Sequence, residues 1–282
     1  MATMETDRTT NLYLDLLKQV LTRRVVPELY RPLVGRWDID NPVLRTLLAP
    51  LRKLLDKKGM VILRRCEGPW IEGLSGSDWP PEAETMVPLA RLDNVQACIQ
   101  AVVREGVPGD LIEAGTWRGG TAIFMRAALD AFGDLDRILW VADSFEGLPK
   151  PDPGQYPKDA GDNHWERSYY LAVSLEQVQA NFKRYGFLDQ RVRFLKGWFK
   201  DTLPAAPIGR LAVVRLDGDM YESTIQSLDA LYPKLSVGGY LIADDYNLPG
   251  CRAAVDDYRA SHGISEEILT IDHGAVYWRR EK

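Results

Sequence analysis

The fold is decided by the stretch Leu111-Ile112-Glu113-Ala114-Gly115-Thr116-Trp117-Arg118-Gly119-Gly120-Thr121. Apolar residues over 107–114 predict an approach and a short buried strand, and the apolar run over 121–129 predicts a helix. The glycines between them predict a tight turn, which lets backbone N–H groups approach a ligand beside the positive end of a helix. The unit therefore indicates a ligand-binding strand–turn–helix, with a plain strand-to-helix turn as the alternative.

The spacing within this turn is Glu-x-Gly-x-x-x-Gly, counted from Glu113. Folds that bind NAD carry Gly-x-Gly-x-x-Gly at the corresponding turn. The difference favours S-adenosylmethionine as the ligand over NAD. A dehydrogenase is therefore the weaker hypothesis, and we expect S-adenosylmethionine rather than NAD to raise the Tm of the protein.

The composition is that of an ordinary globular protein. Of the 282 residues, 45% are hydrophobic and 27% are charged, and the net charge of −5 argues against nucleic-acid binding. Cys66, Cys98 and Cys251 lack metal-binding spacing, which indicates reduced thiols. The sequence shows neither an N-terminal signal core nor an apolar run long enough for a membrane span. We therefore expect a cytoplasmic protein without membrane or nucleic-acid partners.

Beyond residue 106 the chain alternates strand-like and helix-like runs, which predicts an α/β fold. Apolar runs predict parallel strands at 107–114, 138–142, 191–196, 211–216 and 240–243. A turn is expected at Gly238-Gly239 before the last of these strands. Residues 267–271 and 275–279 flank Asp272-His273-Gly274 and predict an antiparallel hairpin, with His273 as a turn residue. A Rossmann-like, mostly parallel seven-stranded sheet with such a C-terminal hairpin is typical of class I S-adenosylmethionine-dependent methyltransferases.

Residues 1–84 lack this alternation and predict a helical extension that ends in a surface loop over 66–84. The first ten residues are polar and are expected to be frayed. One predicted helical face carries the apolar residues Tyr13, Leu16, Leu17, Val20 and Leu21. We therefore expect an extension over 1–84 that serves dimerisation or covers the substrate, and a methyltransferase domain over 85–282.

Two positions after predicted strands suit a nucleoside. One strand ends in Asp143-Ser144-Phe145, and an acidic side chain there is placed to bond ribose hydroxyls. A turn or helix-capping Asp is the alternative. Trp198 follows the next strand and is expected either to stack on the adenine or to pack in the core.

Residues 146–170, which we call the lid, show no apolar periodicity. The lid carries four prolines and three glycines, and it follows the carboxyl end of a strand, where open α/β sheets bind ligands. We expect it to cover the substrate. Its residue His164 is a candidate base or substrate contact, although a single loop histidine is often incidental.

Acidic residues gather where two neighbouring predicted strands end. Asp217 and Asp219 follow one strand, and Asp244 and Asp245 follow the other. Like charges at one edge repel and raise one another's pKa unless a cation neutralises them. Oxygen ligands without His or Cys favour Mg²⁺ over Mn²⁺ or Ca²⁺. A Mg²⁺ site is therefore predicted, and the alternative is that some of these residues cap the following helices.

A metal would suit methyl transfer to a hydroxyl. The reaction is an in-line displacement at the sulfonium methyl group, and an aliphatic hydroxyl is too weak an acid to ionise at neutral pH. Coordination lowers its pKa while a nearby base removes the proton. Asp219, two residues from the proposed ligand Asp217, is the first candidate base, and His164 is the second.

Five stretches carry a resemblance to a known family. They are Tyr13-Leu14-Asp15-Leu16-Leu17-Lys18, Gly109-Asp110-Leu111-Ile112-Glu113-Ala114-Gly115-Thr116-Trp117-Arg118-Gly119-Gly120, Asp143-Ser144-Phe145-Glu146-Gly147-Leu148-Pro149, Leu216-Asp217-Gly218-Asp219-Met220-Tyr221-Glu222-Ser223-Thr224 and Asp244-Asp245-Tyr246. From about residue 11 onward the chain resembles the macrocin O-methyltransferase (TylF/MycF-type) family. Those enzymes use S-adenosylmethionine and Mg²⁺ to methylate sugar hydroxyls of macrolides and related antibiotics. Residues 31–78 match least.

The resemblance implies roles for particular residues. It implies Asp217, Asp244 and Asp245 as Mg²⁺ ligands and Asp219 as the base, and His164 lies where some members use a lid histidine. It also implies that residues 113–117 and 143–147 hold the cofactor, with Thr85 and Met86 reaching its methionine part. The cofactor candidates are thus Thr85, Met86, Glu113, Gly115, Thr116, Trp117, Asp143, Ser144, Phe145 and Trp198. The family tends to form dimers through N-terminal elements.

We therefore expect an S-adenosylmethionine- and Mg²⁺-dependent O-methyltransferase that acts on a sugar hydroxyl of a glycosylated natural product, as a homodimer or higher homo-oligomer. A metal-dependent catechol or phenol O-methyltransferase is the alternative enzyme, and it would methylate free catechols but not a glycoside. A non-catalytic scaffold that binds S-adenosylmethionine is the alternative without turnover.

Overall fold

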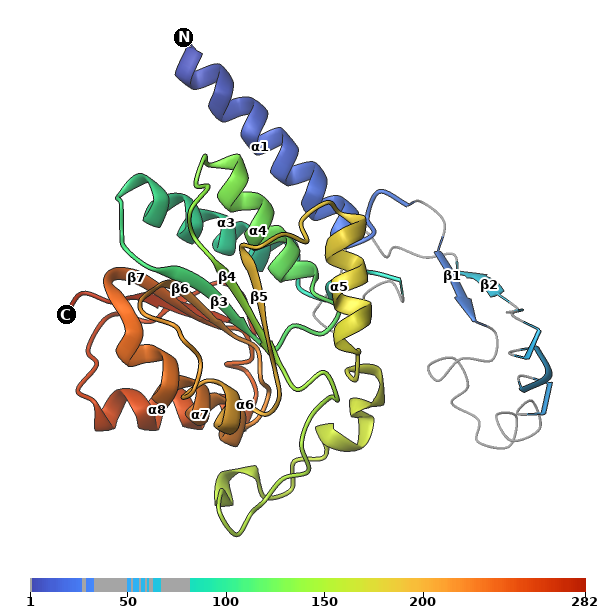
Figure 1. Ribbon diagram of the computed structural model, residues 1–282. Helices are drawn as coiled ribbons and strands as arrows, with labels where there is room; N and C mark the ends of the chain where they lie inside the picture. The colour runs from blue at the N-terminus through green and yellow to red at the C-terminus, as the bar shows by residue number, and fades with distance from the viewer. Residues whose placement is uncertain are drawn as a thin grey trace.

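A seven-stranded sheet organises the part of the chain that the computed structural model describes, which comprises residues 2–26, 29–32, 50–51, 53–55, 57–58, 60, 63–66 and 82–282 (Figure 1). The strands follow the order β5-β4-β3-β6-β7-β9-β8. Their bounds are β3 (Asp110–Ala114), β4 (Leu139–Asp143), β5 (Val192–Lys196), β6 (Leu211–Leu216), β7 (Leu235–Ala243), β8 (Leu269–Thr270) and β9 (Val276–Arg279). The first five in this order run parallel, and β9 is antiparallel to both of its neighbours. The predicted sheet and its closing hairpin are confirmed.

The central strands are apolar on both faces because helices cover both. Alternate side chains of a strand point to opposite faces. Leu111 therefore packs into the core on one side of the sheet, and its neighbour Ile112 packs into the core on the other. Trp140 and Val141 divide in the same way. This pattern places the carboxyl ends of β3, β4, β6 and β7 along one edge, where the predicted site residues follow.

Figure 1 shows the two helical layers. One face is covered by α1 (Ala2–Leu21), α3 (Leu89–Arg104), α4 (Gly120–Ala131) and α5 (Leu175–Arg184). The other face is covered by α6 (Phe199–Thr202), α7 (Tyr221–Leu231) and α8 (Pro249–Ser261). Short 3-10 turns occur at η1 (Pro157–Asp159), η2 (His164–Tyr170) and η3 (Tyr232–Lys234). Among the helices in the described residues, none is long and apolar enough to cross a membrane.

The N-terminal helix α1 differs from its prediction in two ways. It is helical from Ala2, although the first ten residues were expected to be frayed. The predicted apolar face is divided: Leu17 and Leu21 are buried together with Leu14, while Tyr13 and Leu16 are 42% and 59% exposed. Lys18 is buried beside these leucines, and its Nζ pairs with Asp93 of α3 at 2.6 Å.

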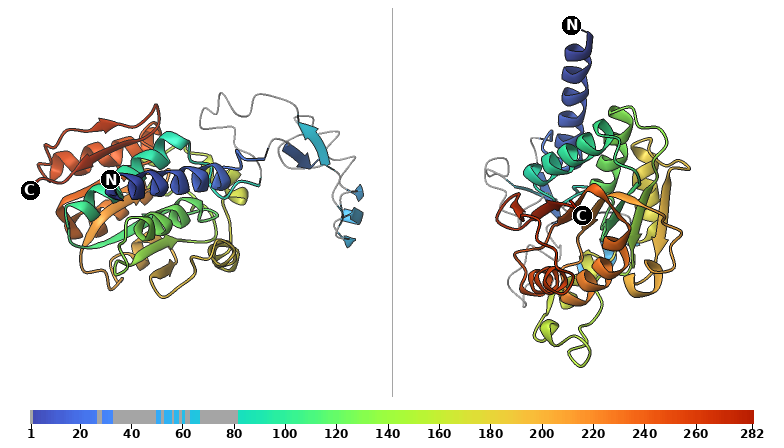
Figure 2. Two further views of the ribbon diagram at one scale, coloured as in Figure 1. Left: turned by 90° about the horizontal axis from the view of Figure 1, so that it is seen from above. Right: turned by 90° about the vertical axis from the view of Figure 1, so that its left-hand side faces the viewer.

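Helix α1 lies against α4, and its N-terminal part projects beyond the sheet (Figure 2). Its leucines join the same core as α3 and α4. The extension also holds an antiparallel pair, β1 (Leu29–Pro32) with β2 (Leu63–Cys66), which the sequence analysis did not predict. Most of the loop predicted over 66–84 lies outside the described residues, and the boundary near residue 84 stays a prediction.

The expected turn at Gly238-Gly239 is wrong. Both glycines lie inside β7, which begins at Leu235. Gly238 has φ +86°, and the register with β6 shifts between Leu211 and Val213. The glycines therefore form an irregularity within one longer strand, because left-handed backbone geometry is compatible with continued pairing on either side.

Candidate active site

A cavity of about 790 Å³ lies at the carboxyl ends of the parallel strands. It is lined by all but one of the residues that the sequence analysis assigned to the site: Thr85, Met86, Glu113, Gly115, Thr116, Trp117, Asp143, Ser144, His164, Trp198, Asp217, Asp219, Asp244 and Asp245. Phe145 is the exception. Its side chain is 5% exposed and packs in the core, while its backbone N–H donates to Oδ1 of Asp143 at 2.7 Å.

The Gly-rich turn of residues 113–120 brings two strand ends into close contact. Gly115 has φ +91°, and a Cβ added there would lie 1.7 Å from the carbonyl oxygen of Asp217. Only glycine fits this position, because any side chain would collide with the backbone that follows β6. The turn that begins at Glu113 and the turn that carries Asp217 are thus held side by side.

Asp143 connects the two segments predicted to hold the cofactor. Its Oδ2 accepts from the backbone N–H of Thr116 at 2.7 Å, and its Oδ1 accepts from Phe145. Burial raises the pKa of Asp143, and these backbone hydrogen bonds oppose the rise. The carboxylate therefore fixes the turn after β3 relative to the turn after β4.

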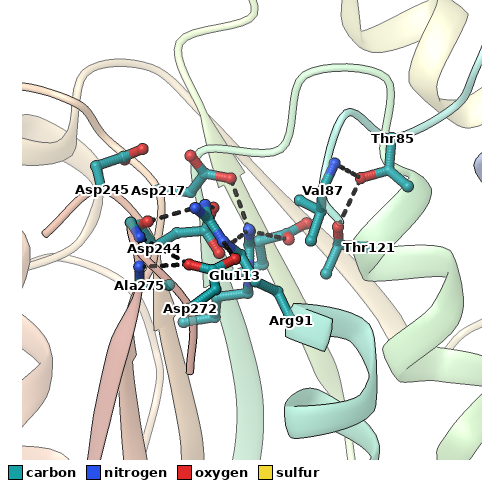
Figure 3. Close-up of polar contacts among 12 residues, drawn as sticks. Thr85, Val87, Arg91, Glu113, Thr121, Asp217, Asp244, Asp245, Asp272 and Ala275 are labelled. Atoms are coloured by element: carbon teal, nitrogen blue, oxygen red, sulfur yellow. Dashed lines mark hydrogen bonds and ion pairs between the residues drawn. The ribbon is translucent and has the colours of Figure 1, made fainter. Parts of the chain in front are cut away.

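The segment before α3 closes the same end of the cavity. Thr85 Oγ1 lies 3.0 Å from Thr121 Oγ1 at the start of α4 and accepts from Val87 N at 3.1 Å (Figure 3). Gly120 donates its backbone N–H to the carbonyl oxygen of Glu84 at 3.0 Å. Thr85 and Met86 thus lie beside the Gly-rich turn and line the cavity, and their contact with the methionine part of the cofactor stays a prediction.

Three carboxylates converge in the same cavity, beside the Gly-rich turn, and we call Asp217, Asp244 and Asp245 the acidic cluster. Each offers one oxygen within 4.8 Å of the others, and Figure 3 shows the three side by side. Burial, followed by repulsion from Asp219 and Asp217, raises the pKa of Asp245 well above its usual value. The described residues therefore leave the cluster with excess negative charge.

Two buried arginines that the sequence analysis missed compensate part of this charge. Nη2 of Arg215 in β6 lies 2.7 Å from Oδ1 of Asp244 and 2.8 Å from Oδ2 of Asp217. Arg91 in α3 places Nη1 2.6 Å from Oδ2 of Asp244 and Nε 2.8 Å from Asp272. A basic residue within the otherwise apolar run Leu-Ala-Val-Val-Arg-Leu was the available signal, because a buried arginine requires carboxylate partners.

Glu113 belongs to the same network. Its side chain is 1% exposed, Oε1 accepts from Arg215 at 2.7 Å and Oε2 accepts from the hydroxyl of Thr116 at 2.9 Å. Burial raises the pKa of Glu113 to about 7, although Arg215 opposes the rise. Both oxygens of this predicted cofactor residue are thus engaged by protein groups.

Asp219 lies between the acidic cluster and the lid. It adopts φ +59°, an unusual left-handed conformation for Asp, and its N–H donates to Oδ2 of Asp245 at 3.0 Å. Burial and the neighbouring Asp217 raise the pKa of Asp219 to about 7, and the imidazole of His164 lowers it. A carboxyl group with this pKa can accept a proton near neutral pH.

The lid reaches over the cavity and contacts the Gly-rich turn. Trp117 donates its indole N–H to the carbonyl oxygen of Tyr170 at 2.8 Å. His164 lines the cavity, and its Nδ1 lies 3.0 Å from Oδ1 of Asp162. Residues of the lid therefore line the cavity, and its role as a cover for the substrate stays a prediction.

Further cavity residues had no role in the sequence analysis. They are Lys150, Gln155, Phe199, Lys200, Gln226, Asn247 and His273. His273 was expected only to form a turn; it lies in that turn and also lines the cavity. Phe199 and Lys200 lie in α6 and Gln226 lies in α7, whereas Lys150, Gln155, Asn247 and His273 lie outside the helices and strands, where no periodic pattern marks them.

Comparison with known proteins agrees with this geometry. Residues 10–280 match the family model described as Macrocin-O-methyltransferase (TylF). The 8-demethyl-8-(2,3-dimethoxy-alpha-L-rhamnosyl)-tetracenomycin-C 4'-O-methyltransferase of Streptomyces olivaceus is 50% identical over 274 residues, which is 97% of this chain and 94% of that protein.

The Mycinamicin III 3''-O-methyltransferase of Micromonospora griseorubida is 53% identical over 208 residues, 73% of this chain and 82% of that protein. Among solved structures, the O-methyltransferase NovP superposes with a TM-score of 0.78 and 43% identity, covering 97% of this chain and 100% of NovP.

Proposed function

The chain belongs to the macrocin O-methyltransferase (TylF) family, and from this membership we propose that it transfers the methyl group of S-adenosylmethionine to a sugar hydroxyl of a glycosylated natural product. It is an O-methyltransferase with the fold of enzymes that bind S-adenosylmethionine. The observation that carries the proposal is one cavity lined by both the Gly-rich turn and the acidic cluster.

The cofactor end of the cavity suits S-adenosylmethionine. Gly115, Thr85 and Met86 line the same cavity, where the methionine part would lie. Asp143 and Ser144 would face the ribose, and Trp198, which lines the cavity and is not a core residue, would contact the adenine. Glu113 also lines the cavity, and it would hold the turn in place through Arg215 and Thr116.

The acidic cluster fits Mg²⁺, because its donors are oxygens only and one oxygen from each of its three carboxylates lies within 4.8 Å of the others. Asp217, Asp244 and Asp245 would hold the ion. When bound, S-adenosylmethionine supplies the electrophilic methyl group, and Mg²⁺ supplies a Lewis acid that polarises the acceptor hydroxyl.

The protein's own groups then orient the acceptor and accept its proton. Asp219, with a pKa of about 7, is the proposed base. His164 is the second candidate, because the lid places its imidazole on the same cavity. The lid and the short helix α6, which carries Lys200, would exclude water from the reacting atoms.

We also propose that α1 contributes to a homodimer or higher homo-oligomer. Its outer face exposes Leu12, Tyr13 and Leu16, at 60%, 42% and 59% of their surface. An apolar stripe of this kind suits burial against a second copy. Sedimentation of the Leu16→Asp variant should show a shift towards monomer.

The activity is tested with a panel of acceptors. Wild-type protein is incubated with isotopically labelled S-adenosylmethionine, Mg²⁺ and one of three acceptors: a rhamnosyl glycoside of an aromatic polyketide, its aglycone or a free catechol. We expect a methylated sugar from the glycoside alone, identified by mass spectrometry. Transfer to the catechol but not to the glycoside would refute the proposed acceptor class.

A further inference from the structure

Asp159 is a buried carboxylate of the lid to which the proposed chemistry assigns no role. It ends η1 and is 1% exposed. Its Oδ1 accepts from the backbone N–H of Tyr221 at 2.7 Å, and its Oδ2 accepts from the backbone N–H of Glu222 at 2.9 Å. These two residues are the first two of α7.

This contact completes the N-terminus of α7. The first N–H groups of a helix have no partner within the helix, and a carboxylate there also interacts favourably with the helix dipole. The N-cap residue Met220 makes no side-chain capping bond. Asp159, which precedes Tyr221 by 62 residues, therefore caps the helix in place of the N-cap side chain.

The capped helix starts directly after the turn that carries the catalytic candidates. Asp219 lies directly before Met220, the N-cap residue of α7. Its backbone is in a left-handed conformation. Gly250 of α8 packs against the same point, since a Cβ added there would lie 2.9 Å from Tyr221 N and 3.1 Å from Oδ1 of Asp159. The cap thus fixes the end of the Asp219 turn in a closely packed environment.

The other side of the cap leads to His164. The carbonyl oxygen of Asp159 accepts from Asp162 N at 3.1 Å. Oδ1 of Asp162 in turn accepts from the backbone N–H of His164 at 2.8 Å and lies 3.0 Å from its Nδ1. A continuous series of hydrogen bonds therefore connects the start of α7 to the lid imidazole.

The geometry points to Asp159 as a positioning residue for the proposed methyl transfer: it fixes the lid to the N-terminus of α7 and thereby sets His164 relative to Asp219 across the cavity. This inference rests on the proposed function. The neighbouring pair of Lys158 and Asp257 also connects η1 to α8, but its side chains are 45% and 44% exposed. Such exposed pairs contribute little. Asp257 also accepts from the hydroxyl of Tyr221 at 2.9 Å, a bond that the amide oxygen of Asn can keep. Asp257→Asn is therefore a matched control for the loss of one carboxylate charge.

The test compares Asp159→Ala, Asp159→Asn and Asp257→Asn with wild type in methyl transfer to the glycoside. We expect Asp159→Ala to lower kcat/KM for the acceptor about 100-fold, the effect of misplacing reacting groups by about 1 Å. Asp159→Asn, whose amide oxygen still accepts one N–H, should fall between Asp159→Ala and wild type. Asp257→Asn should stay within about twofold of wild type.

A purely structural role would move other quantities as well. Calorimetry should give a Kd for S-adenosylhomocysteine within about twofold of wild type in Asp159→Ala, because only the acceptor side is misplaced. Unchanged kcat/KM in either folded Asp159 variant would overturn the inference. A loss of cofactor affinity in proportion to the loss of kcat/KM would also overturn it, since it would indicate general destabilisation.

Amide hydrogen exchange tests the capping contact of Asp159 without any substrate. In Asp159→Ala the backbone amides of Tyr221 and Glu222 should exchange faster than in wild type and in Asp257→Asn, and unchanged exchange would contradict the cap. If the wild-type protein methylates no glycoside, the proposed function fails, while this exchange result still decides whether Asp159 fixes the lid to α7.

Discussion

The guanidinium of Arg215 lies 2.7 Å from the carboxylate of Asp244, and both side chains are almost fully buried. The protein therefore carries an internal counter-charge within its acidic cluster. A metal ion would complete this network rather than create it. We therefore expect the protein to fold without the metal ion and to need the ion only for methyl transfer. The predictions about metal removal and Arg215 follow from this.

Metal removal should abolish transfer but spare the fold. With EDTA, we expect no methylated glycoside and a Tm close to that with Mg²⁺, because Arg215 and Arg91 already compensate Asp244 and Asp217. Thermal melts and the transfer assay check this. Unfolding in EDTA would show that the arginines do not suffice.

Asp217→Asn should abolish transfer and leave the binding of S-adenosylhomocysteine largely intact. Asp217 is at the metal end of the cavity and offers one of the three converging oxygens. Kinetics and calorimetry measure the two effects, with Asp229→Asn on the exposed side of α7 as the control. Normal turnover by Asp217→Asn would mean that the metal assignment is wrong.

Asp219→Asn should slow the chemical step while Mg²⁺ binding persists. The amide cannot accept the acceptor's proton, and general-base catalysis contributes about 100-fold or more. Single-turnover rates for Asp219→Asn and His164→Gln distinguish the two candidates. Unchanged rates in Asp219→Asn would transfer the base role to His164 or to solvent.

Arg215→Met should destabilise the fold by about 3–5 kcal/mol, because it leaves buried carboxylates without their cation. The carboxylates concerned are those of Glu113, Asp217 and Asp244. Urea unfolding with and without Mg²⁺ measures the loss, and Mg²⁺ should restore part of it. A variant as stable as wild type would contradict the compensating role of Arg215.

Asp272→Asn should destabilise the fold in a pH-dependent way. Burial alone would raise the pKa of Asp272, but hydrogen bonds from Arg91 and the Gly274 backbone outweigh it and lower the pKa. The ionised form is therefore favoured in the folded state, so its contribution is present above about pH 3.8 and is lost as the pH falls through the lowered value.

At pH 7 the loss in Asp272→Asn should be about 1–3 kcal/mol, the value of a hydrogen bond to a charged group. Urea unfolding at pH 7 and in acid checks this, and the gap from wild type should narrow in acid. The amide oxygen can still accept from Gly274 and Ala275, so the turn itself should persist. If the free energy of unfolding of Asp272→Asn differed from that of wild type by the same amount at every pH, the ionic contribution of Asp272 would be contradicted.

The sequence predicted the sheet well because buried parallel strands are continuous apolar runs that end in a turn. Leu211 to Leu216 and the two Asp residues that follow illustrate this, since both the strand and the place of Asp217 followed from pattern alone. The parallel arrangement then predicted which residues lie close together, because the carboxyl ends of parallel strands meet at one edge of the sheet.

The remaining features depend on partners that no local pattern specifies. The apolar pattern of α1 did not show that Lys18 would be buried, because its partner Asp93 belongs to another helix. Asp159 lies in a segment rich in Pro and Gly, and its partners begin a helix far along the chain. Arg215 alone carried a visible signal, a charge inside an apolar strand.

The most direct test of the central claim is calorimetric titration of S-adenosylhomocysteine into the wild-type protein, once with Mg²⁺ and once with EDTA. The account predicts tight binding with similar Kd in both, because the Gly-rich turn holds the cofactor and the acidic cluster serves the acceptor. Binding only with Mg²⁺ would contradict this division of the cavity, and no binding in either case would contradict the methyltransferase assignment itself.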